Sequence, residues 1–352
     1  MKLMKRMLAL CLTLVMVLAL SACSGSSSDD DDETDAATEA EAEDAGDDAA
    51  EEAASYNIAI VKQMDHASLD EIAEAIAAEL DAIAEENGIT IEYTIYSGQG
   101  DESTLQSIGE QVIAEGVDAI IPIATTAAQI MTVCAEDTQT PVIYAAISDP
   151  ESADLTDIDY VTGTSDALNT EYILDMMLAI DPDVETVGLL YSLSETNSEA
   201  SIAEAKAYLD ELGIAYVEAT GNTTDEIITA ASVLISENVD AIFTPTDNIV
   251  MAAELSIAET LAEAGIPHYT GADSFVRNGG FATCGVNYTE LGYYTADLAY
   301  TAITDGMDDL EDYYLMDGGI ITVNTETAAT LGIDYSVFAD MGELVEVVTS
   351  ED

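Results

Sequence analysis

Residues 239–248 read Val239-Asp240-Ala241-Ile242-Phe243-Thr244-Pro245-Thr246-Asp247-Asn248, and this stretch decides the fold. A similar stretch lies earlier in the chain and reads Val117-Asp118-Ala119-Ile120-Ile121-Pro122-Ile123-Ala124-Thr125-Thr126. Each is an apolar run, rich in β-branched residues, that ends in small polar residues and precedes a helix-like segment, 127–133 or 249–261. This order predicts a buried parallel strand, a turn and then a helix in each stretch.

The sequences that flank the two stretches also correspond. Gly88-Ile89 precedes the first stretch and Gly213-Ile214 the second, while Pro141-Val142 follows the first and Pro267-His268 the second. A duplication of this length predicts two similar α/β halves that face each other across a cleft. We therefore expect an α/β fold with two Rossmann-like lobes, parallel sheets and a multi-strand hinge, and a small molecule bound in the cleft.

The elements expected along the chain place the boundaries of the two lobes. Strands are expected at 58–61, 89–96, 117–123, 142–147 and 160–163, and again at 187–191, 214–218, 239–244, 267–271 and 282–286. The amphipathic segment 291–303 comes after the second half and is expected to return and pack on the first. Lobe 1 is accordingly expected at 56–162 and 288–316, and lobe 2 at 163–287 and 317–352.

The charge balance excludes several classes of protein. The 352 residues include 71 Asp and Glu but only 6 Lys and Arg. A nucleic-acid-binding protein needs a basic surface to neutralise phosphates, and docking onto anionic lipid by charge needs one too, so we expect neither. The acidic residues are expected to face water.

Motifs of common enzymes and metal sites are missing from the sequence. The first strand–helix turn, Lys62-Gln63-Met64-Asp65, has no Gly-rich nucleotide fingerprint, and the chain has no Walker loop and no nucleophile elbow. Cys134 and Cys284 could pair outside the cell, but nothing in their spacing favours a bond, so free thiols are expected. No set of Cys and His suits zinc. We expect a protein that is not an enzyme and that needs no cofactor or metal.

The N-terminal residues predict export and a lipid anchor. Lys2, Lys5 and Arg6 precede an apolar run, 7–20, that is short for a membrane span and typical of a signal peptide. The following Leu20-Ser21-Ala22-Cys23 resembles a bacterial lipobox, which implies a signal peptide at 1–22 and lipid attachment at Cys23. Serines, acids and alanines fill 24–55 and cannot form a core, so 23–55 is expected to be a lipidated, disordered tether.

The loops beyond the carboxyl ends of the strands are the candidates for a binding site, because ligands of open parallel sheets bind there. Their polar residues are mainly Ser, Thr, Asn and Asp, which are also favoured N-caps of helices, so capping is the alternative interpretation for each. The candidate ligand-binding residues in these loops are Gln63, His66, Thr125, Thr126, Ser148, Asp149, Tyr191, Asn197, Ser198, Thr246, Asp247, Asn248 and Asp273.

A zwitterionic ligand suits these loops, because it needs little help from basic side chains. Together with the helix-start amides, a ligand carboxylate is expected at Thr125, Thr126, Asn197 and Ser198. Asp247 and Asp273 are expected to accept hydrogen bonds from an ammonium group. Tyr191 and Tyr144 are expected to flank an apolar or aromatic side chain, with strand closure and core packing as their alternatives.

Several of these segments resemble, in order, a known family. They are Asp65-His66-Ala67-Ser68-Leu69-Asp70, Pro122-Ile123-Ala124-Thr125-Thr126-Ala127, Ser148-Asp149-Pro150, Val161-Thr162-Gly163-Thr164-Ser165-Asp166, Leu190-Tyr191-Ser192, Glu195-Thr196-Asn197-Ser198, Pro245-Thr246-Asp247-Asn248 and Asn287-Tyr288. The set is similar to the substrate-binding lipoproteins of bacterial ABC transporters, in the tryptophan/tyrosine-type subgroup with the type I periplasmic-binding-protein fold. The resemblance implies a monomer that closes on an amino acid, often aromatic, and delivers it to a permease and its ATPase.

The chain departs from that family at positions near the expected cleft. Ala67 stands where proline is usual, and Asn287 stands where aspartate is common, so Asn287 joins the candidate ligand-binding residues. The expected function is a lipid-anchored, extracytoplasmic receptor for an aromatic or branched amino acid. The alternatives are a sugar, nucleoside or peptide in the same fold, or a ligand sensor without a role in transport. A sugar site usually stacks an aromatic ring on the sugar, and this chain has no Trp and four Phe.

Overall fold

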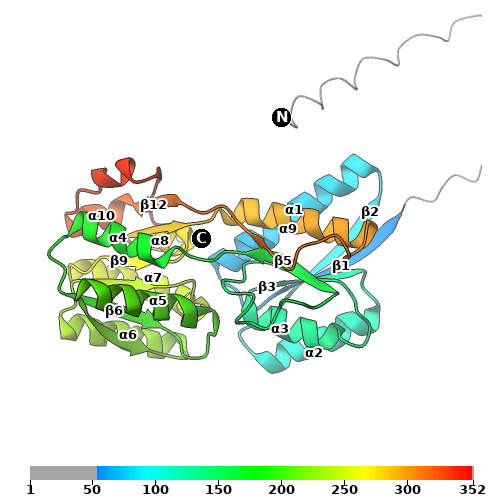
Figure 1. Ribbon diagram of the computed structural model, residues 1–352, viewed down its shortest axis with the longest axis horizontal. Helices are drawn as coiled ribbons and strands as arrows, with labels where there is room; N and C mark the ends of the chain where they lie inside the picture. The colour runs from blue at the N-terminus through cyan, green and yellow to red at the C-terminus, as the bar shows by residue number, and fades with distance from the viewer. Residues whose placement is uncertain (1–53, 351–352) are drawn as a thin grey trace, which may run out of the picture. The chain divides into compact units, whose positions relative to one another are not determined.

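The structure is a computed structural model that describes residues 54–350 (Figure 1). The first half contains β1 (Ser55–Lys62), α1 (Ala67–Asn87), β2 (Thr90–Ser97), α2 (Glu102–Glu115), β3 (Ala119–Ile123), α3 (Thr125–Ala135), β4 (Val142–Tyr144) and β5 (Val161–Ser165). The second half contains α4 (Thr170–Ile180), β6 (Thr186–Tyr191), α5 (Asn197–Leu212), β7 (Ala215–Thr220), α6 (Thr224–Glu237), β8 (Ala241–Thr244), α7 (Asn248–Glu263), β9 (His268–Thr270), α8 (Asp273–Arg277) and β10 (Ala282–Gly285). The chain continues through α9 (Tyr288–Thr304), β11 (Tyr314–Leu315), β12 (Ile320–Asn324), α10 (Thr325–Leu331), the 3₁₀ helix η1 (Ser336–Asp340) and β13 (Glu343–Val347).

The two halves have the same strand order, as a duplication requires. The order is β2-β1-β3-β4-β5 in the first sheet and β7-β6-β8-β9-β10 in the second, and every pairing within these sets is parallel. The repeated sequence stretches form β3 and β8, which occupy the same place in the two sheets. Every residue of β3 and β8 is buried, because helices cover both faces of each sheet. The expected α/β fold with two parallel-sheet lobes is confirmed.

Three segments connect the two sheets and form the expected hinge. They are residues 166–169 between β5 and α4, residues 286–287 between β10 and α9, and residues 316–319 between β11 and β12. One pairing differs from the prediction of wholly parallel sheets, because β12 runs antiparallel to β10. The chain leaves the second sheet after β10 and returns to it from the first sheet as β12. Strand β12 therefore runs in the direction opposite to β10.

Helix α9 returns to the first sheet and packs along α1 (Figure 1). The close approach depends on Gly292, where a Cβ would lie 2.6 Å from the Ala75 Cβ and 2.9 Å from the Ile72 carbonyl oxygen. Segment 291–303 therefore packs on the first half. The lobe boundaries at 162/163 and 316/317 remain predictions, and β5 continues to Ser165, beyond the first of them.

The two cysteines of the described residues are free thiols, Cys134 in α3 and Cys284 in β10. The predicted signal peptide at 1–22, the lipid-anchored Cys23 and the tether up to residue 53 lie outside the described residues. The tether was expected to end at residue 55, but β1 already begins at Ser55. Between residues 54 and 350, no helix has the length and apolar character needed to cross a membrane.

Candidate functional site

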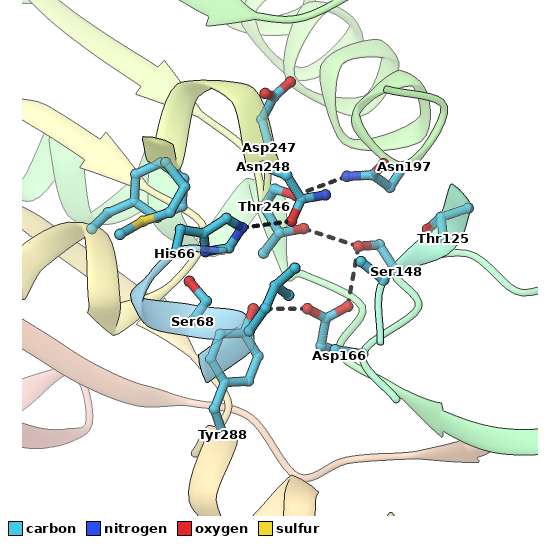
Figure 2. A pocket seen from close by; sticks show the side chains of 15 residues that line it. His66, Ser68, Thr125, Ser148, Asp166, Asn197, Thr246, Asp247, Asn248 and Tyr288 are labelled. Atoms are coloured by element: carbon cyan, nitrogen blue, oxygen red, sulfur yellow. Dashed lines mark hydrogen bonds between the residues drawn. The ribbon is translucent and has the colours of Figure 1, made fainter. Parts of the chain in front are cut away.

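A small cavity lies where the carboxyl ends of the two sheets face each other (Figure 2). Its free volume is about 20 Å³, room for roughly one water molecule. A ligand the size of an amino acid therefore enters only when the two rims separate. The lining residues are His66, Ser68, Leu69, Ala124, Thr125, Ala146, Ser148, Asp166, Asn197, Thr246, Asp247, Asn248, Met251, Phe275 and Tyr288.

The two rims contact each other through four side-chain hydrogen bonds. Each bond joins a loop or helix start of the first half to one of the second half, so the loop-bearing rims point toward one another. The bonds are Gln63–Glu195 at 2.7 Å, His66–Asn248 at 3.0 Å, Ser68–Ser274 at 2.5 Å and Ser148–Thr246 at 2.9 Å.

Six helices begin at the cavity wall. Helices α1, α3, α5, α7, α8 and α9 each follow the carboxyl end of a strand, and each contributes a residue of its first turn to the lining. None of the lining residues is Lys or Arg. Lys62, at the end of β1, instead pairs with Asp65 and Asp70. The positive ends of the helix dipoles are therefore the main partners available to an anionic group here.

Asp166 is the carboxylate that the cavity offers to a ligand. It follows β5, is 3% exposed, and accepts hydrogen bonds from the hydroxyl groups of Ser148 (3.1 Å) and Tyr288 (2.9 Å). Each carboxylate oxygen keeps further acceptor capacity, because each accepts only one of these bonds. Burial raises the pKa of Asp166, and a nearby cation would oppose that shift.

Asp247, by contrast, has no acceptor capacity to spare in this structure. One oxygen accepts hydrogen bonds from the backbone N–H groups of Ile249 and Val250, as the N-cap of α7. The other accepts from the Ser192 N–H and the Ser198 hydroxyl, both at 2.7 Å. The carboxylate is fully buried and ties α7 to the loop after β6, while its role toward a ligand ammonium group stays a prediction that these four bonds disfavour.

Asn197 presents an unused acceptor at the cavity wall. Its Nδ2 donates to the Thr246 carbonyl oxygen at 2.8 Å, which fixes the orientation of the amide. Its Oδ1 is buried and has no hydrogen-bond partner, and the residue is 7% exposed. A buried acceptor without a partner is costly unless a ligand or a water satisfies it.

A chain of polar side chains runs beside the cavity through His66, Asn248 and Glu195. Asn248 Nδ2 donates to Glu195 at 2.6 Å, and the His66 ring contacts Asn248 Oδ1. Burial and then the nearby Asp247 carboxylate raise the pKa of Glu195 to about 7. Burial lowers the pKa of His66 to about 4, so the ring is neutral at physiological pH.

Two cavity residues hold strained backbone conformations. Ala124, the N-cap of α3, has φ 75° and ψ 161°, a region that glycine almost alone adopts. Ala146, after β4, has φ 58°. Strain of this kind persists only where the surroundings enforce it, and it is frequent at ligand-binding sites.

The structure brings seven of the predicted residues into the cavity wall. They are His66, Thr125, Ser148, Asn197, Thr246, Asp247 and Asn248. Gln63 and Ser198 stand directly behind the wall, since Gln63 bonds to the Thr126 N–H and to Glu195, and Ser198 bonds to Asp247. Thr126 does not line the cavity, and its backbone N–H donates to Gln63 Oε1 behind the wall.

The other predicted residues lie away from the cavity. The Tyr191 hydroxyl donates to Glu218, so this ring closes its strand as the alternative interpretation held. Tyr144 is a core residue, as its own alternative held. Asp149 caps the turn at Ser152.

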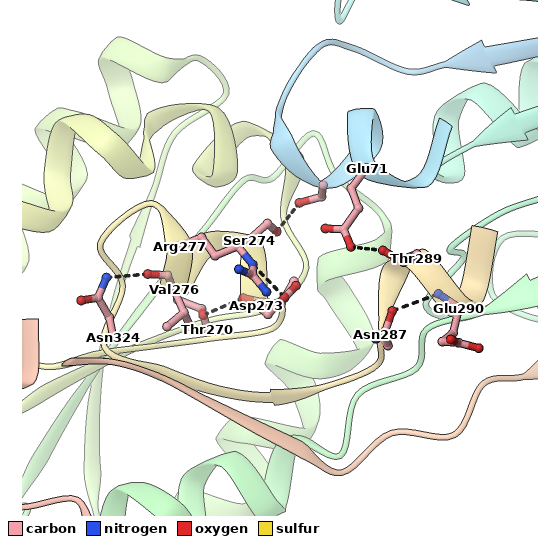
Figure 3. A network of polar contacts seen from close by, with 12 residues as sticks. Glu71, Thr270, Asp273, Ser274, Val276, Arg277, Asn287, Thr289, Glu290 and Asn324 are labelled. Atoms are coloured by element: carbon pink, nitrogen blue, oxygen red, sulfur yellow. Dashed lines mark hydrogen bonds and ion pairs between the residues drawn. The ribbon is translucent and has the colours of Figure 1, made fainter. Parts of the chain in front are cut away.

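Asp273 and Asn287 line a neighbouring groove (Figure 3). There Asp273 pairs with Arg277 at 3.1 Å, and Asn287 accepts a hydrogen bond from the Glu290 N–H as the N-cap of α9. An aspartate at position 287 would cap the helix equally well, so this departure from the family pattern leaves the cap unchanged.

The sequence analysis did not predict Asp166 and Tyr288 as site residues, nor the apolar wall of Leu69, Met251 and Phe275. Asp166 could have been found, because it lies three residues after the predicted strand 160–163, in a segment that resembles the family. Within residues 54–350, no cluster of three or more His, Cys, Asp or Glu is arranged to hold a metal ion.

The chain is similar to proteins of one family over most of its length. A family model described as ABC transporter substrate binding protein matches residues 57–337. A tyrosine-binding protein of Clostridioides difficile (strain R20291) is 29% identical over 248 residues, which cover 69% of this chain and 71% of that protein.

Two solved structures support the fold. An ABC domain from Streptococcus pneumonia in complex with L-Trp is 29% identical, with a TM-score of 0.74 over 83% of this chain and 100% of that one. The ligand-free, open structure of a substrate-binding protein with adhesive properties from Clostridium difficile is 26% identical, with a TM-score of 0.63 over 84% and 100%. The type I periplasmic-binding-protein fold is thereby confirmed.

Proposed function

The chain belongs to the family of ABC transporter substrate-binding proteins, and we propose that its lobes open to admit one aromatic or branched amino acid and close on its zwitterionic group. As a member of a family of binding proteins, it is not an enzyme. The relatives bind tyrosine or tryptophan, which supports an amino acid as the ligand here.

The observation that carries the proposal is the buried Asp166 carboxylate facing a cavity whose wall has no basic side chain. The ligand ammonium group would bind Asp166 and the unpartnered Asn197 Oδ1, which together supply negative charge and directed acceptors. The ligand carboxylate would bind at the first turn of α3 beside Thr125, where the helix dipole favours an anion. The apolar wall of Leu69, Met251 and Phe275 would contact the ligand side chain.

A thermal-shift assay of the purified protein with each of the twenty amino acids tests this proposal. A ligand that binds only the folded protein stabilises it by about 2.7 kcal/mol at a hundredfold excess over Kd. We expect aromatic or branched amino acids to raise the melting temperature. A set of sugars and nucleosides serves as the comparison. A shift with one of these, and none with any amino acid, would refute the amino-acid assignment.

We further propose that the protein is a monomer held by a lipid at Cys23 on the outer face of the cytoplasmic membrane, where it serves an ABC permease and its ATPase. The basic start, the apolar run and the lipobox-like Leu20-Ser21-Ala22-Cys23 support this. The Cys23→Ser variant should lose labelling by radioactive fatty acid in the producing bacterium and appear in the medium. Unchanged labelling would place the lipid elsewhere, and an unlabelled wild-type protein would rule out the anchor.

A further inference from the structure

We propose that His66 determines specificity: its Nδ1 accepts a hydrogen bond from an N–H or O–H group on the ligand's side chain, so the protein selects tyrosine or tryptophan over phenylalanine and leucine. This proposal rests on the proposed amino-acid function. It assigns a residue and a chemical requirement to the side-chain end of the ligand, where the apolar wall alone would accept any large hydrophobic group.

The orientation of Asn248 fixes which nitrogen of His66 carries the proton. Above its pKa of about 7 the Glu195 carboxyl is ionised and can only accept, so Asn248 Nδ2 donates to its Oε2, at 2.6 Å. Asn248 Oδ1 therefore faces the His66 Nε2 atom at 3.0 Å and must accept from it. Because burial keeps the ring neutral, with a pKa of about 4, the proton on Nε2 leaves Nδ1 as a bare acceptor.

The Nδ1 atom is buried and has no hydrogen-bond partner. His66 is the N-cap residue of α1, where its ring could have accepted an N–H group of the first turn, yet it makes no such bond. The ring instead reaches across to the second half, at the cavity wall (Figure 2). A buried acceptor left unpaired in this way calls for a donor, and a ligand in the cavity can supply one.

The position of His66 places this acceptor at the side-chain end of the site. Leu69 follows it by three residues at the start of α1, and Met251 lies one turn after its partner Asn248 on α7. All four of these residues line the cavity, so the His66–Asn248 contact adjoins the apolar wall. The acceptors proposed for the ammonium group come from other elements, Asp166 after β5 and Asn197 at the start of α5.

A site with a fixed acceptor discriminates strongly against a ligand that lacks the donor, because such a ligand leaves the acceptor buried and unpaired. We expect tyrosine and tryptophan to bind about 10- to 100-fold more tightly than phenylalanine, a typical range for one unsatisfied polar group. O-methyltyrosine, which keeps the oxygen and loses the donor, should bind at least as weakly as phenylalanine.

Titration calorimetry at pH 7.5 with these four ligands tests the proposal on the wild type, His66→Leu and His66→Gln. His66→Leu also removes the cross-cleft bond to Asn248 and should weaken every ligand, but it should weaken tyrosine and tryptophan by about a further 10- to 100-fold, to the level of phenylalanine in the same variant. His66→Gln, which keeps an acceptor oxygen, should retain part of the preference. Asp65→Asn, an exposed change in the same loop, is the matched control and should keep the full preference.

The outcomes separate this proposal from the proposed function. If no amino acid binds the wild type, the function itself fails. If amino acids bind but tyrosine and phenylalanine bind equally, or if His66→Leu weakens both to the same extent, the role of His66 is refuted and the function stands.

A measurement on the wild-type protein tests the same contact even if the His66 variants do not fold. The chain has only two histidines, so ¹⁵N-histidine NMR resolves each ring. The Nδ1 signal of His66 should shift on binding tyrosine and stay in place with phenylalanine. An identical signal with both ligands would refute the contact.

Discussion

Gln63 Nε2 donates a hydrogen bond of 2.7 Å to Glu195 Oε1 across the cleft. Gln63 lies in the loop after β1 and Glu195 in the loop after β6, so the first loops of the two repeated halves meet each other. Gln63 Oε1 also accepts from the Thr126 N–H at 3.1 Å, which fixes its amide. The pair belongs to the closed arrangement of the lobes, and it does not itself line the cavity.

Gln63→Leu should therefore weaken ligand binding by removing a bond between the lobes, although residue 63 does not line the cavity. A hydrogen bond to a charged group contributes about 1.5–3 kcal/mol, so we expect Kd to rise roughly 10- to 100-fold. Gln129→Leu is the matched control, because Gln129 Nε2 bonds to Ala153 within the first half. Calorimetry that finds the same affinity in both variants would show that the Gln63–Glu195 bond does not support closure.

Asp247→Ala should destabilise the fold, because it removes an N-cap and four hydrogen bonds from a fully buried carboxylate. We expect the free energy of unfolding to fall by roughly 2–4 kcal/mol. Asp101→Ala, which removes the exposed N-cap of α2, should lower the free energy of unfolding much less. Urea unfolding measures both, and equal losses would contradict the buried role given to Asp247.

Asp166→Asn should abolish most amino-acid binding while the protein stays folded. The charge that pairs with the ligand ammonium group is lost, which we expect to weaken binding by about 100-fold. The folded protein tolerates the change, because burial already disfavours the ionised form and raises the pKa of Asp166. Asp149→Asn, a carboxylate on the cap of a turn nearby, should bind as the wild type does. Calorimetry with unchanged affinity in Asp166→Asn would remove Asp166 from the site.

The raised pKa of Glu195 predicts how stability depends on pH. A carboxyl whose pKa rises from 4.5 to about 7 on folding stabilises the fold fully below pH 4.5, and that stabilisation disappears as the pH rises through 7. The advantage of the wild type over Glu195→Gln in unfolding free energy should therefore shrink between pH 5 and pH 8. Urea unfolding of both proteins at several pH values measures this difference in unfolding free energy, and a difference that does not change with pH would contradict the raised pKa of Glu195.

The pH dependence that His66 contributes runs the other way. Folding lowers the pKa of His66, so its contribution to stability is lost as the pH falls from 6.5 toward 4.

The repeated stretches predicted the fold because a buried parallel strand can be recognised from its own residues and those directly after it. Strands β3 and β8 are apolar and β-branched, and each is followed by polar residues at a helix start. The rule that ligands bind at the carboxyl ends of strands then placed seven candidate residues in the cavity wall. Helix α4 was not predicted, although its buried residues Ile173, Leu174 and Met177 recur at helical spacing.

The individual roles could not be predicted, because capping and ligand binding select the same residue types. Asp247 and Asp166 both follow a strand, and only their hydrogen-bond partners show that one carboxylate is saturated and the other has spare acceptors. The tautomer of His66 likewise depends on Asn248 and Glu195, which lie far from it in the sequence.

The most direct test of the zwitterion site is calorimetry of the full chain with L-tyrosine, tyramine and 3-(4-hydroxyphenyl)propionate. The last two ligands keep the aromatic ring and lose the carboxylate or the ammonium group. L-tyrosine should bind at least 100-fold more tightly than either of them, because each lacks one half of the charge pair that Asp166 and the start of α3 would hold. Equal binding of all three, or binding of none while a sugar or nucleoside binds, would contradict the account.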